Sequence, residues 1–181
     1  MKTNRIFLCM TIISAGLIIF SETFFALAAQ SMPQHMKFLK LADNEIIQIE
    51  SGTLEVHDQE NKAYFTKDVK VVQGTTTLQA DEMVVLYRDK NYLSGNGIRR
   101  INIARNILMK SGMQQVTAEK GFFDFDTKIF VLTGKQVVLT QGSNVFIGCK
   151  FVVHTDTGDA KLDSCNNRVK IQLDPKSSNM M

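Results

Sequence analysis

A repeat of about 30 residues runs through most of this 181-residue chain and restricts the folds open to it. Four copies align when a small residue is taken as the origin of each: Ser51, Ala80, Ala118 and Gly148. An apolar residue stands two positions before each origin, and apolar or small residues stand three and five positions after it. The origins are 29, 38 and 30 residues apart, so the middle unit carries an insertion, which we place in the loop of residues 89–97.

Within each unit, apolar and polar residues alternate over short segments that end in Gly, Asn, Asp or Thr, which is typical of strands and turns. The inward positions change parity once, between the origin and the third residue after it, and one bulged residue per unit would produce that change. A glycine lies six positions before each of the last three origins, at Gly74, Gly112 and Gly142. These glycines predict tight turns between paired strands.

A single unit of this size cannot bury its own apolar face, so the units must stack and fold over one another. We therefore predict an all-β fold, an elongated antiparallel twisted β-jelly-roll with an apolar interior and open strand edges at both ends. The edges are expected near residues 46–49 and 169–173. The residues expected to join copies through these edges are Ile46, Ile47, Ile49, Val169, Ile171 and Leu173.

The composition agrees with a globular domain, because 44% of the residues are hydrophobic and 22% are charged. The net charge of +3 is too small for a dedicated nucleic-acid-binding protein. Both prolines, Pro33 and Pro175, lie near the ends of the chain, so no proline interrupts the strands between them.

The N-terminal residues have the layout of a secretory signal peptide. Lys2 and Arg5 precede an apolar run over residues 6–20, and Ala26 and Ala28 form a small-residue cleavage pattern. An uncleaved membrane anchor is the competing interpretation, but Glu22 follows an apolar run shorter than the roughly 20 residues needed to span a bilayer. We expect a signal peptide over residues 1–28, an N-terminal extension over 29–44, the β-domain over 45–174 and a flexible tail over 175–181.

Two cysteines remain after removal of the signal peptide, Cys149 and Cys165, and an exported compartment permits a disulfide between them. A hairpin turn at residues 155–158 would bring them close together. However, the alternation that points Leu162 inward places Cys165 on the opposite face, which favours two free thiols by a small margin. Both alternatives remain open at this point.

Nothing in the sequence indicates an enzyme or a metal site. His35, His57 and His154 are far apart and have no cysteine or carboxylate partner at metal-ligand spacing. Catalytic serine, phosphate-binding and dinucleotide-binding motifs are missing from the sequence. Asp124 and Asp126 alternate with phenylalanines and are expected to face solvent. We therefore expect no catalytic residues, no metal and no cofactor.

The repeat units also resemble the OstA-like domain of the LptA family of lipopolysaccharide-transport proteins. The matching segments are residues 63–74 with 78–81, residues 132–139 with 141–142, and the closing pattern of Gly148, Phe151 and Gly158. The resemblance extends over roughly residues 45–174. The chain departs from the family where Gly-Asn-Val is usual, because Thr66-Lys67-Asp68-Val69 and Ala104-Arg105-Asn106-Ile107 stand there.

This resemblance implies a periplasmic β-jelly-roll that carries lipopolysaccharide, through its lipid A part, from the inner to the outer membrane. It also implies an inner-membrane LptC-like partner, an outer-membrane LptD-like partner and head-to-tail joining of copies through the strand edges. Two alternatives stay open: a membrane-anchored LptC-like member of the same superfamily, and an envelope scaffold that binds no lipid.

The residues predicted to face the interior are either core or the lining of an acyl-chain groove, and the resemblance favours the groove for some of them. They are Leu78, Met83, Val85, Ile107, Met109, Val116, Phe123, Phe125, Phe151 and Val153. A basic cluster is predicted from Arg99, Arg100, Arg105 and Lys110. These side chains either contact lipid phosphates or form an ordinary solvated strand surface.

Overall fold

The computed structural model describes residues 45–88 and 97–176. The predicted signal peptide and extension, residues 89–96 of the insertion and residues 177–181 of the tail lie outside the described residues. All described residues belong to one compact unit.

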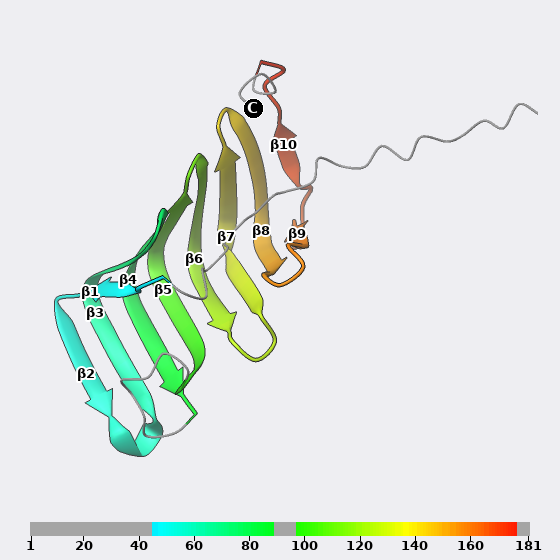
Figure 1. Cartoon of the computed structure of the whole chain (residues 1–181). Helices are drawn as coiled ribbons and strands as arrows, with labels where there is room; N and C mark the ends of the chain where they lie inside the picture. The colour runs from blue at the N-terminus through cyan, green and yellow to red at the C-terminus, as the bar shows by residue number, and fades with distance from the viewer. Residues whose placement is uncertain (1–44, 89–96, 177–181) are drawn as a thin grey trace, which may run out of the picture. The chain divides into compact units, whose positions relative to one another are not determined.

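The described residues form one antiparallel sheet, as the repeat predicted (Figure 1). The strands are β1 (Gln48–Glu50), β2 (Thr53–His57), β3 (Lys62–Gln73), β4 (Thr76–Tyr87), β5 (Ile98–Ser111), β6 (Gln114–Asp124), β7 (Ile129–Gln141), β8 (Asn144–His154), β9 (Ala160–Asp163) and β10 (Lys170–Gln172), with a 3-10 turn η1 (Asp58–Glu60) after β2. Each long strand pairs with the next one in the chain, so the order from β3 to β8 is sequential.

At each end of the sheet, two short strands pair with different parts of one long strand. β1 and β2 both pair with β3. The strand is interrupted between them at residues 51–52, where the Gly52 amide donates to the Lys67 carbonyl over 2.8 Å. In the same way, β9 and β10 both pair with β8. The predicted edge segments therefore do lie at the ends of the sheet. However, the first strand begins later than expected, at Gln48, and neither β2 nor β9 was foreseen as part of an edge.

Glycine-led turns connect three of the hairpins. Gly74, Gly112 and Gly142 each begin a two-residue turn and have φ values of +55°, +56° and +57°. Positive φ at the first turn residue alone is the pattern of a type II′ turn, whose twist matches that of the paired strands. The sequence-based prediction of tight turns at these glycines is confirmed.

A line of bulges crosses the long strands near their middles, and the strands bend there (Figure 1). On β3 the bulged residues are Lys67 and Asp68, and on β5 they are Arg105 and Asn106. The predicted parity change is also confirmed, because Ala80 and Met83, three residues apart on either side of the β4 bulge, are both buried.

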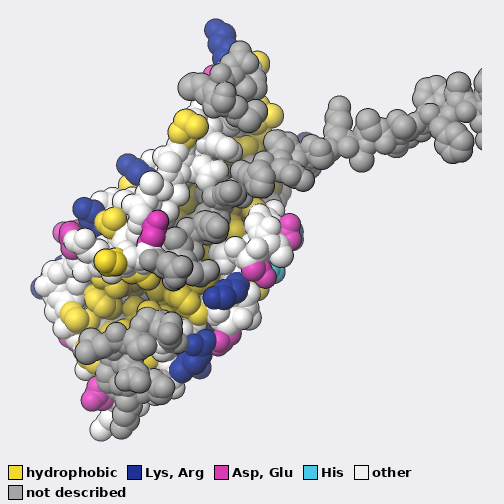
Figure 2. Space-filling view, in the orientation of Figure 1, with side chains coloured by type: hydrophobic (Ala, Val, Ile, Leu, Met, Phe, Trp, Pro, Cys, Tyr) yellow, Lys and Arg dark blue, Asp and Glu magenta, His cyan; other side chains and the backbone are white. Residues whose placement is uncertain are grey.

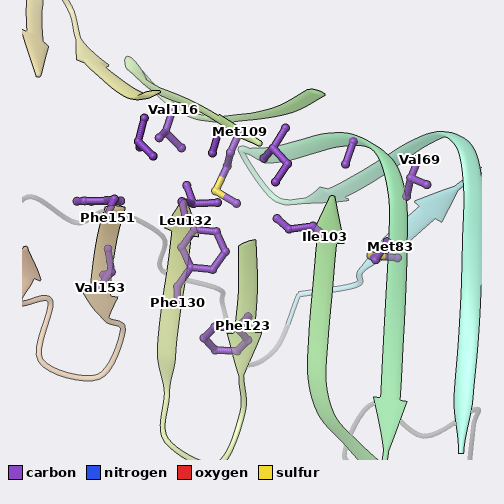
Figure 3. Packing of buried hydrophobic residues seen from close by; sticks show 14 of the residues in the cluster. Val69, Met83, Ile103, Met109, Val116, Phe123, Phe130, Leu132, Phe151 and Val153 are labelled. Carbon is purple, nitrogen blue, oxygen red and sulfur yellow. The ribbon is translucent and has the colours of Figure 1, made fainter. Parts of the chain in front are cut away.

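The bend divides the sheet into two halves whose inner faces pack together. We call the part between the bulges and the glycine turns the turn half, which includes β1 and β10. The remainder, which includes β2 and β9 and ends near Arg88 and Gly97 and at residues 125–128 and 155–159, is the loop half. Figure 3 shows Met109 and Val116 of the turn half projecting toward Phe130 and Leu132 of the loop half. The core is the layer of side chains between these two inner faces.

Candidate functional site

The space between the two halves is filled by apolar side chains from every long strand. The cluster has 17 buried members: Ala63, Val69, Ala80, Met83, Val85, Ile103, Ile107, Met109, Val116, Ala118, Phe123, Phe130, Leu132, Val137, Leu139, Phe151 and Val153. Because the sheet is continuous, this interior extends from β3 to β8, with Ile49 of β1 and Leu162 of β9 packed against it. Among the described residues, no charged side chain is buried.

All ten residues predicted to face the interior do so, but they differ in what they can contact. Eight of them are members of the buried cluster. Leu78 and Phe125 are only partly buried and pack against its margin. The eight buried residues expose at most 7% of their surface, so in this conformation Leu78 and Phe125 offer a ligand more surface than any of them.

Burial decreases from the bend toward the strand ends. On β4, Ala80, Met83 and Val85 are buried, whereas Leu78 at one end and Tyr87 at the other are half-buried. The half-buried apolar residues against the core are Ile49, Phe65, Val71, Leu78, Tyr87, Ile98, Ile101, Phe125, Phe146 and Leu162. In Figure 2, hydrophobic side chains gather in the middle of the face shown, within a border of polar and charged ones.

The aromatic residues at the margin of the loop half were only partly foreseen. Phe125 packs edge-to-face on Phe123, with ring centroids 4.6 Å apart, and the Lys128 ammonium lies 6.0 Å from the Phe125 ring. Tyr87, which the sequence-based set omitted, has its pKa raised by partial burial, so its phenol stays neutral. The repeat offers a signal for Tyr87, because this residue and Phe125 both stand seven positions after an origin.

The four basic residues predicted to form a cluster all lie on β5, but the structure does not bring them together. Arg99 and Lys110 are 11 positions apart, which corresponds to roughly 36 Å along a strand. Arg100 stacks on Phe122, 3.7 Å from its centroid, and lies 3.9 Å from an Asp124 oxygen on the outer face. Lys110 lies on the outer face of the turn half, because its neighbour Met109 is in the core.

Arg105 is engaged at the bulge by the acidic pair of β4. Its guanidinium contacts Glu82 and lies 3.5 Å from an Asp81 oxygen, and these carboxylates raise the pKa of Arg105 above its ordinary value, chiefly through the hydrogen bond to Glu82. The Asn106 amide donates to the same Asp81 carboxylate over 2.9 Å. Asp81 and Glu82 therefore bind the two bulged residues of β5, Arg105 and Asn106. A phosphate site shared by the four basic residues is not formed in this structure.

The predicted edge residues are largely exposed. Ile46, Ile47, Ile171 and Leu173 are 90%, 44%, 58% and 64% exposed, and Val169 is 36% exposed. Ile49 differs, because its side chain packs against the core. Leu54 and Val56 on β2 add exposed apolar surface at the N-terminal end, although they occupy the inward positions of the first repeat unit.

Cys149 and Cys165 form a disulfide, with their Cα atoms 5.9 Å apart. The slight preference for free thiols was wrong because it extended the alternation of β9 as far as Cys165. β9 ends at Asp163, and Cys165 lies in a turn with φ of +59°, which directs it back toward β8. Leu162, by contrast, points inward as predicted.

Within residues 45–88 and 97–176, no group of three His, Cys, Asp or Glu side chains is placed to hold a metal ion. Over the same residues, no helix is both long and apolar enough to cross a membrane.

Comparisons with known proteins agree with this architecture. The model of the family described as "LptA/(LptD N-terminal domain) LPS transport protein" matches residues 48–159. An uncharacterized protein of Rhizobium meliloti (strain 1021) is 49% identical over 155 residues, which cover 84% of this chain and 83% of that protein. An uncharacterized Rhizobium etli protein, encoded in the 5′ region of an rpoN-linked probable transport protein, is 61% identical over 44 residues, which cover 24% of this chain and 82% of that protein.

Among solved structures, the chain is similar to LptH of Pseudomonas aeruginosa, described as the LptA-homologous periplasmic component of the lipopolysaccharide transport device. The TM-score is 0.59 at 17% sequence identity, and the match covers 72% of this chain and 96% of that one. At this identity the likeness establishes the fold, a β-jelly-roll of the LptA type.

Proposed function

The chain belongs to the LptA/(LptD N-terminal domain) family of lipopolysaccharide transport proteins, and from this premise we propose that it shields the acyl chains of lipopolysaccharide during passage through the periplasm. Members of this family are transport components and not enzymes. The observation that carries the proposal is the apolar interior between the two halves of the sheet, which extends from β3 to β8 and buries no charged side chain among the described residues.

Acyl chains are costly to expose to water, and this cost explains why a shielding protein is needed. Each methylene group moved from water to an apolar site contributes about 0.8 kcal/mol, so a 12-carbon chain in water costs roughly 10 kcal/mol. A lipid with several chains therefore needs a continuous apolar path across an aqueous compartment. An open sheet bent on itself provides such a path and leaves the sugar part of the lipid in water.

The half-buried apolar residues at the strand ends are the proposed contact surface. Leu78 on the turn half and Phe125 on the loop half both retain exposed surface next to the core. The fully buried residues would contact lipid only if the two halves separated. We therefore propose that acyl chains enter from the strand ends and first contact side chains such as Leu78 and Phe125.

Photo-crosslinking tests this surface directly. A photoreactive residue at position 78 or 125 is expected to label lipopolysaccharide, whereas one at Gln79 or Asp124, the outward neighbours, should not. Leu78→Asp should weaken lipopolysaccharide binding because it places a charge at the apolar margin. Leu108→Asp, on the outer face of the adjacent strand, is the matched control and should bind like the unmodified protein. Labelling confined to positions 79 and 124 would contradict the proposed surface.

The end strands support the remaining parts of the proposal. Among the described residues, β1 and β10 each pair on one side only, and they carry or adjoin exposed apolar side chains, including Ile46, Ile171 and Leu173. Such edges recruit strands from other chains. We propose that they join copies head to tail and contact an inner-membrane LptC-like partner at one end and an outer-membrane LptD-like partner at the other.

The proposed location is the periplasm, reached after cleavage near Ala28. N-terminal sequencing of the protein purified from the cell envelope tests this location. A start at Ala29 or Gln30 is expected for the soluble carrier, whereas retention of residues 1–28 in a membrane fraction would support the anchored LptC-like alternative.

A further inference from the structure

Six uncharged polar side chains form an unbroken row across the sheet, which we call the amide–hydroxyl row. Its members are Gln73, Thr76, Ser111, Gln114, Gln141 and Asn144. Each member is the direct cross-strand partner of the next, so the row passes from β3 to β8 with a member on every strand. The members flank the three glycine turns, as the last residue before each turn and the first residue after it.

The row lies on the inner face of the sheet. Each member stands two positions along its strand from a residue that packs in or against the core, as Ser111 does from Met109 and Gln114 does from Val116. Side chains two positions apart in a strand share a face. Gln73 is buried and the other five are half-buried. The row is therefore the border at which the apolar interior meets water along the whole turn half.

At both of its ends the row already binds backbone groups of this chain. The Gln73 Nε2 group donates to the carbonyl of Glu45, ahead of β1, over 3.4 Å. The Asn144 Oδ1 atom accepts from the amide of Asp174, beyond β10, over 2.9 Å. In between, the hydroxyls of Thr76 and Ser111 are 3.0 Å apart. Side chains of the row thus both donate to and accept from peptide groups at this border.

We propose that the amide–hydroxyl row holds the neutral polar junction of the cargo, namely the amide and ester groups that join acyl chains to a lipid head group and the hydroxyl groups beside them. This proposal rests on the proposed function, because it assumes that the acyl chains lie in the interior. The junction of an acylated lipid lies where its apolar chains meet its hydrated head, which is the same border that the row occupies. Gln and Asn offer both donors and acceptors to such groups.

The even spacing of similar groups along the row favours a ligand that slides along it rather than a ligand that is fixed at one position. Neighbouring strands are roughly 4.8 Å apart, so the five steps from β3 to β8 span roughly 24 Å of similar chemistry. Neutral hydrogen bonds are individually weak, so no single member would trap the lipid. An extended peptide lying along the row repeats every two residues, roughly 6.7 Å, and does not match the strand spacing.

The test compares two probes on one double variant. Gln114→Met combined with Gln141→Met removes two adjacent members of the row at nearly constant side-chain length. The probes are purified lipid A, which has amide and ester junctions, and dodecyltrimethylammonium, which has a 12-carbon chain and no hydrogen-bonding group. We expect the affinity for lipid A to fall roughly 25-fold, about fivefold for each hydrogen bond lost, while the affinity for dodecyltrimethylammonium is unchanged.

The matched control is Gln115→Met combined with Thr140→Val, a cross-strand pair on the outer face of the same two strands, which should change neither affinity. If the double row variant fails to fold, as shown by its thermal melting curve, Thr76→Val with Ser111→Ala tests two other members with the same expectation. An unchanged affinity for lipid A, or an equal loss for both probes, would overturn the role of the row. Failure of the unmodified protein to bind either probe would instead overturn the proposed function, and the row proposal with it.

Discussion

At the residue scale, the bulges place non-glycine residues in the left-handed backbone region. Lys67 and Asp68 have φ of +66° and +54°, and Arg105 and Asn106 have +63° and +49°. A side chain with a Cβ atom in this region costs roughly 1–2 kcal/mol, with asparagine and aspartate the best tolerated. The first residue of each pair is the one where the family resemblance leads us to expect glycine, so this chain carries strain at Lys67 and Arg105.

Replacement of Lys67 by glycine should therefore stabilise the protein. Strain relief of about 1–2 kcal/mol exceeds the roughly 0.4–1 kcal/mol lost through the freer unfolded chain, which leaves a net gain of about 0.5–1 kcal/mol. Lys70→Gly, in a regular part of the same strand, is the control and should destabilise by about 0.5–1 kcal/mol. Urea unfolding measures both changes, and equal destabilisation by the two substitutions would show that the bulge is unstrained.

Asp124 gives a prediction about pH. Its carboxylate accepts from the Thr127 amide, the Thr127 hydroxyl and the Asp126 amide, and the Thr127 amide is the main reason that the pKa of Asp124 lies below its usual value. A lowered folded-state pKa stabilises the fold above the unfolded pKa of about 4, and the contribution is lost as the pH falls through the folded pKa. Asp124→Asn should therefore be less stable than the unmodified protein at pH 7, and the difference should shrink below about pH 4 in denaturant titrations. A difference that is the same at pH 7 and pH 2.5 would contradict this role.

At the element scale, the C-terminal edge depends on a covalent link more than on packing. β10 has three residues, all exposed, and within the described part of the chain it pairs with β8 alone. The disulfide joins β8 to the turn between β9 and β10 and closes a segment of 16 residues. A closed loop of that size stabilises by about 3 kcal/mol in the chain-entropy model.

Removal of the disulfide should thus release the edge before it affects the core. In a Cys149→Ser and Cys165→Ser double variant, the amides of Lys170, Ile171 and Gln172 should lose protection against hydrogen exchange, while β5 and β6 remain protected. A reducing agent should produce the same change in the unmodified protein and no change in the variant. Uniform loss of protection throughout the sheet would show that the disulfide supports the whole fold.

At the scale of the whole molecule, the sheet has different strands at its two ends, β1 with β2 and β9 with β10. Contacts between different surfaces of identical molecules leave one free surface at each end, so they propagate along one direction unless the rotation between copies closes a ring. The exposed apolar residues at both ends, such as Leu54 and Ile171, would be buried in such a contact.

Concentration-dependent head-to-tail oligomers are therefore expected, and deletion of residues 168–181 should suppress them. The deletion removes β10 but keeps Cys165, so the disulfide and the rest of the sheet stay intact. Ile171→Pro should act in the same way because proline disrupts strand pairing, whereas Lys176→Pro lies outside the strand and serves as the control. Static light scattering that shows a strict monomer at high concentration, or an unchanged oligomer after the deletion, would exclude this assembly.

The sequence alone determined the repeat of strands, turns and bulges in this protein. The glycines before the last three origins predicted the turns, and the parity change between positions such as Ala80 and Met83 predicted the bulges. Strand alternation is a local property, so it correctly assigned all ten groove candidates to the inner face. The same locality explains why the ends of the sheet were recognised from the alternation of residues 169–173.

Only the tertiary structure decided how deep each inward residue lies. Val153 is fully buried and Leu78 is not, because burial depends on which side chain of the opposite half lies across from each residue. Phe123→Asp and Val153→Asp would each bury an unpaired charge in the core. They would therefore destabilise the fold, and a loss of lipid binding in these variants would not identify a lipid contact. The disulfide and the dispersal of the basic residues also depended on backbone geometry: Cys165 lies in a turn beyond β9 with a positive φ, and Arg99 and Lys110 lie near opposite ends of the 14-residue strand β5. Local patterns fix the face of a side chain, but the partner across the interior is set by residues distant in the chain.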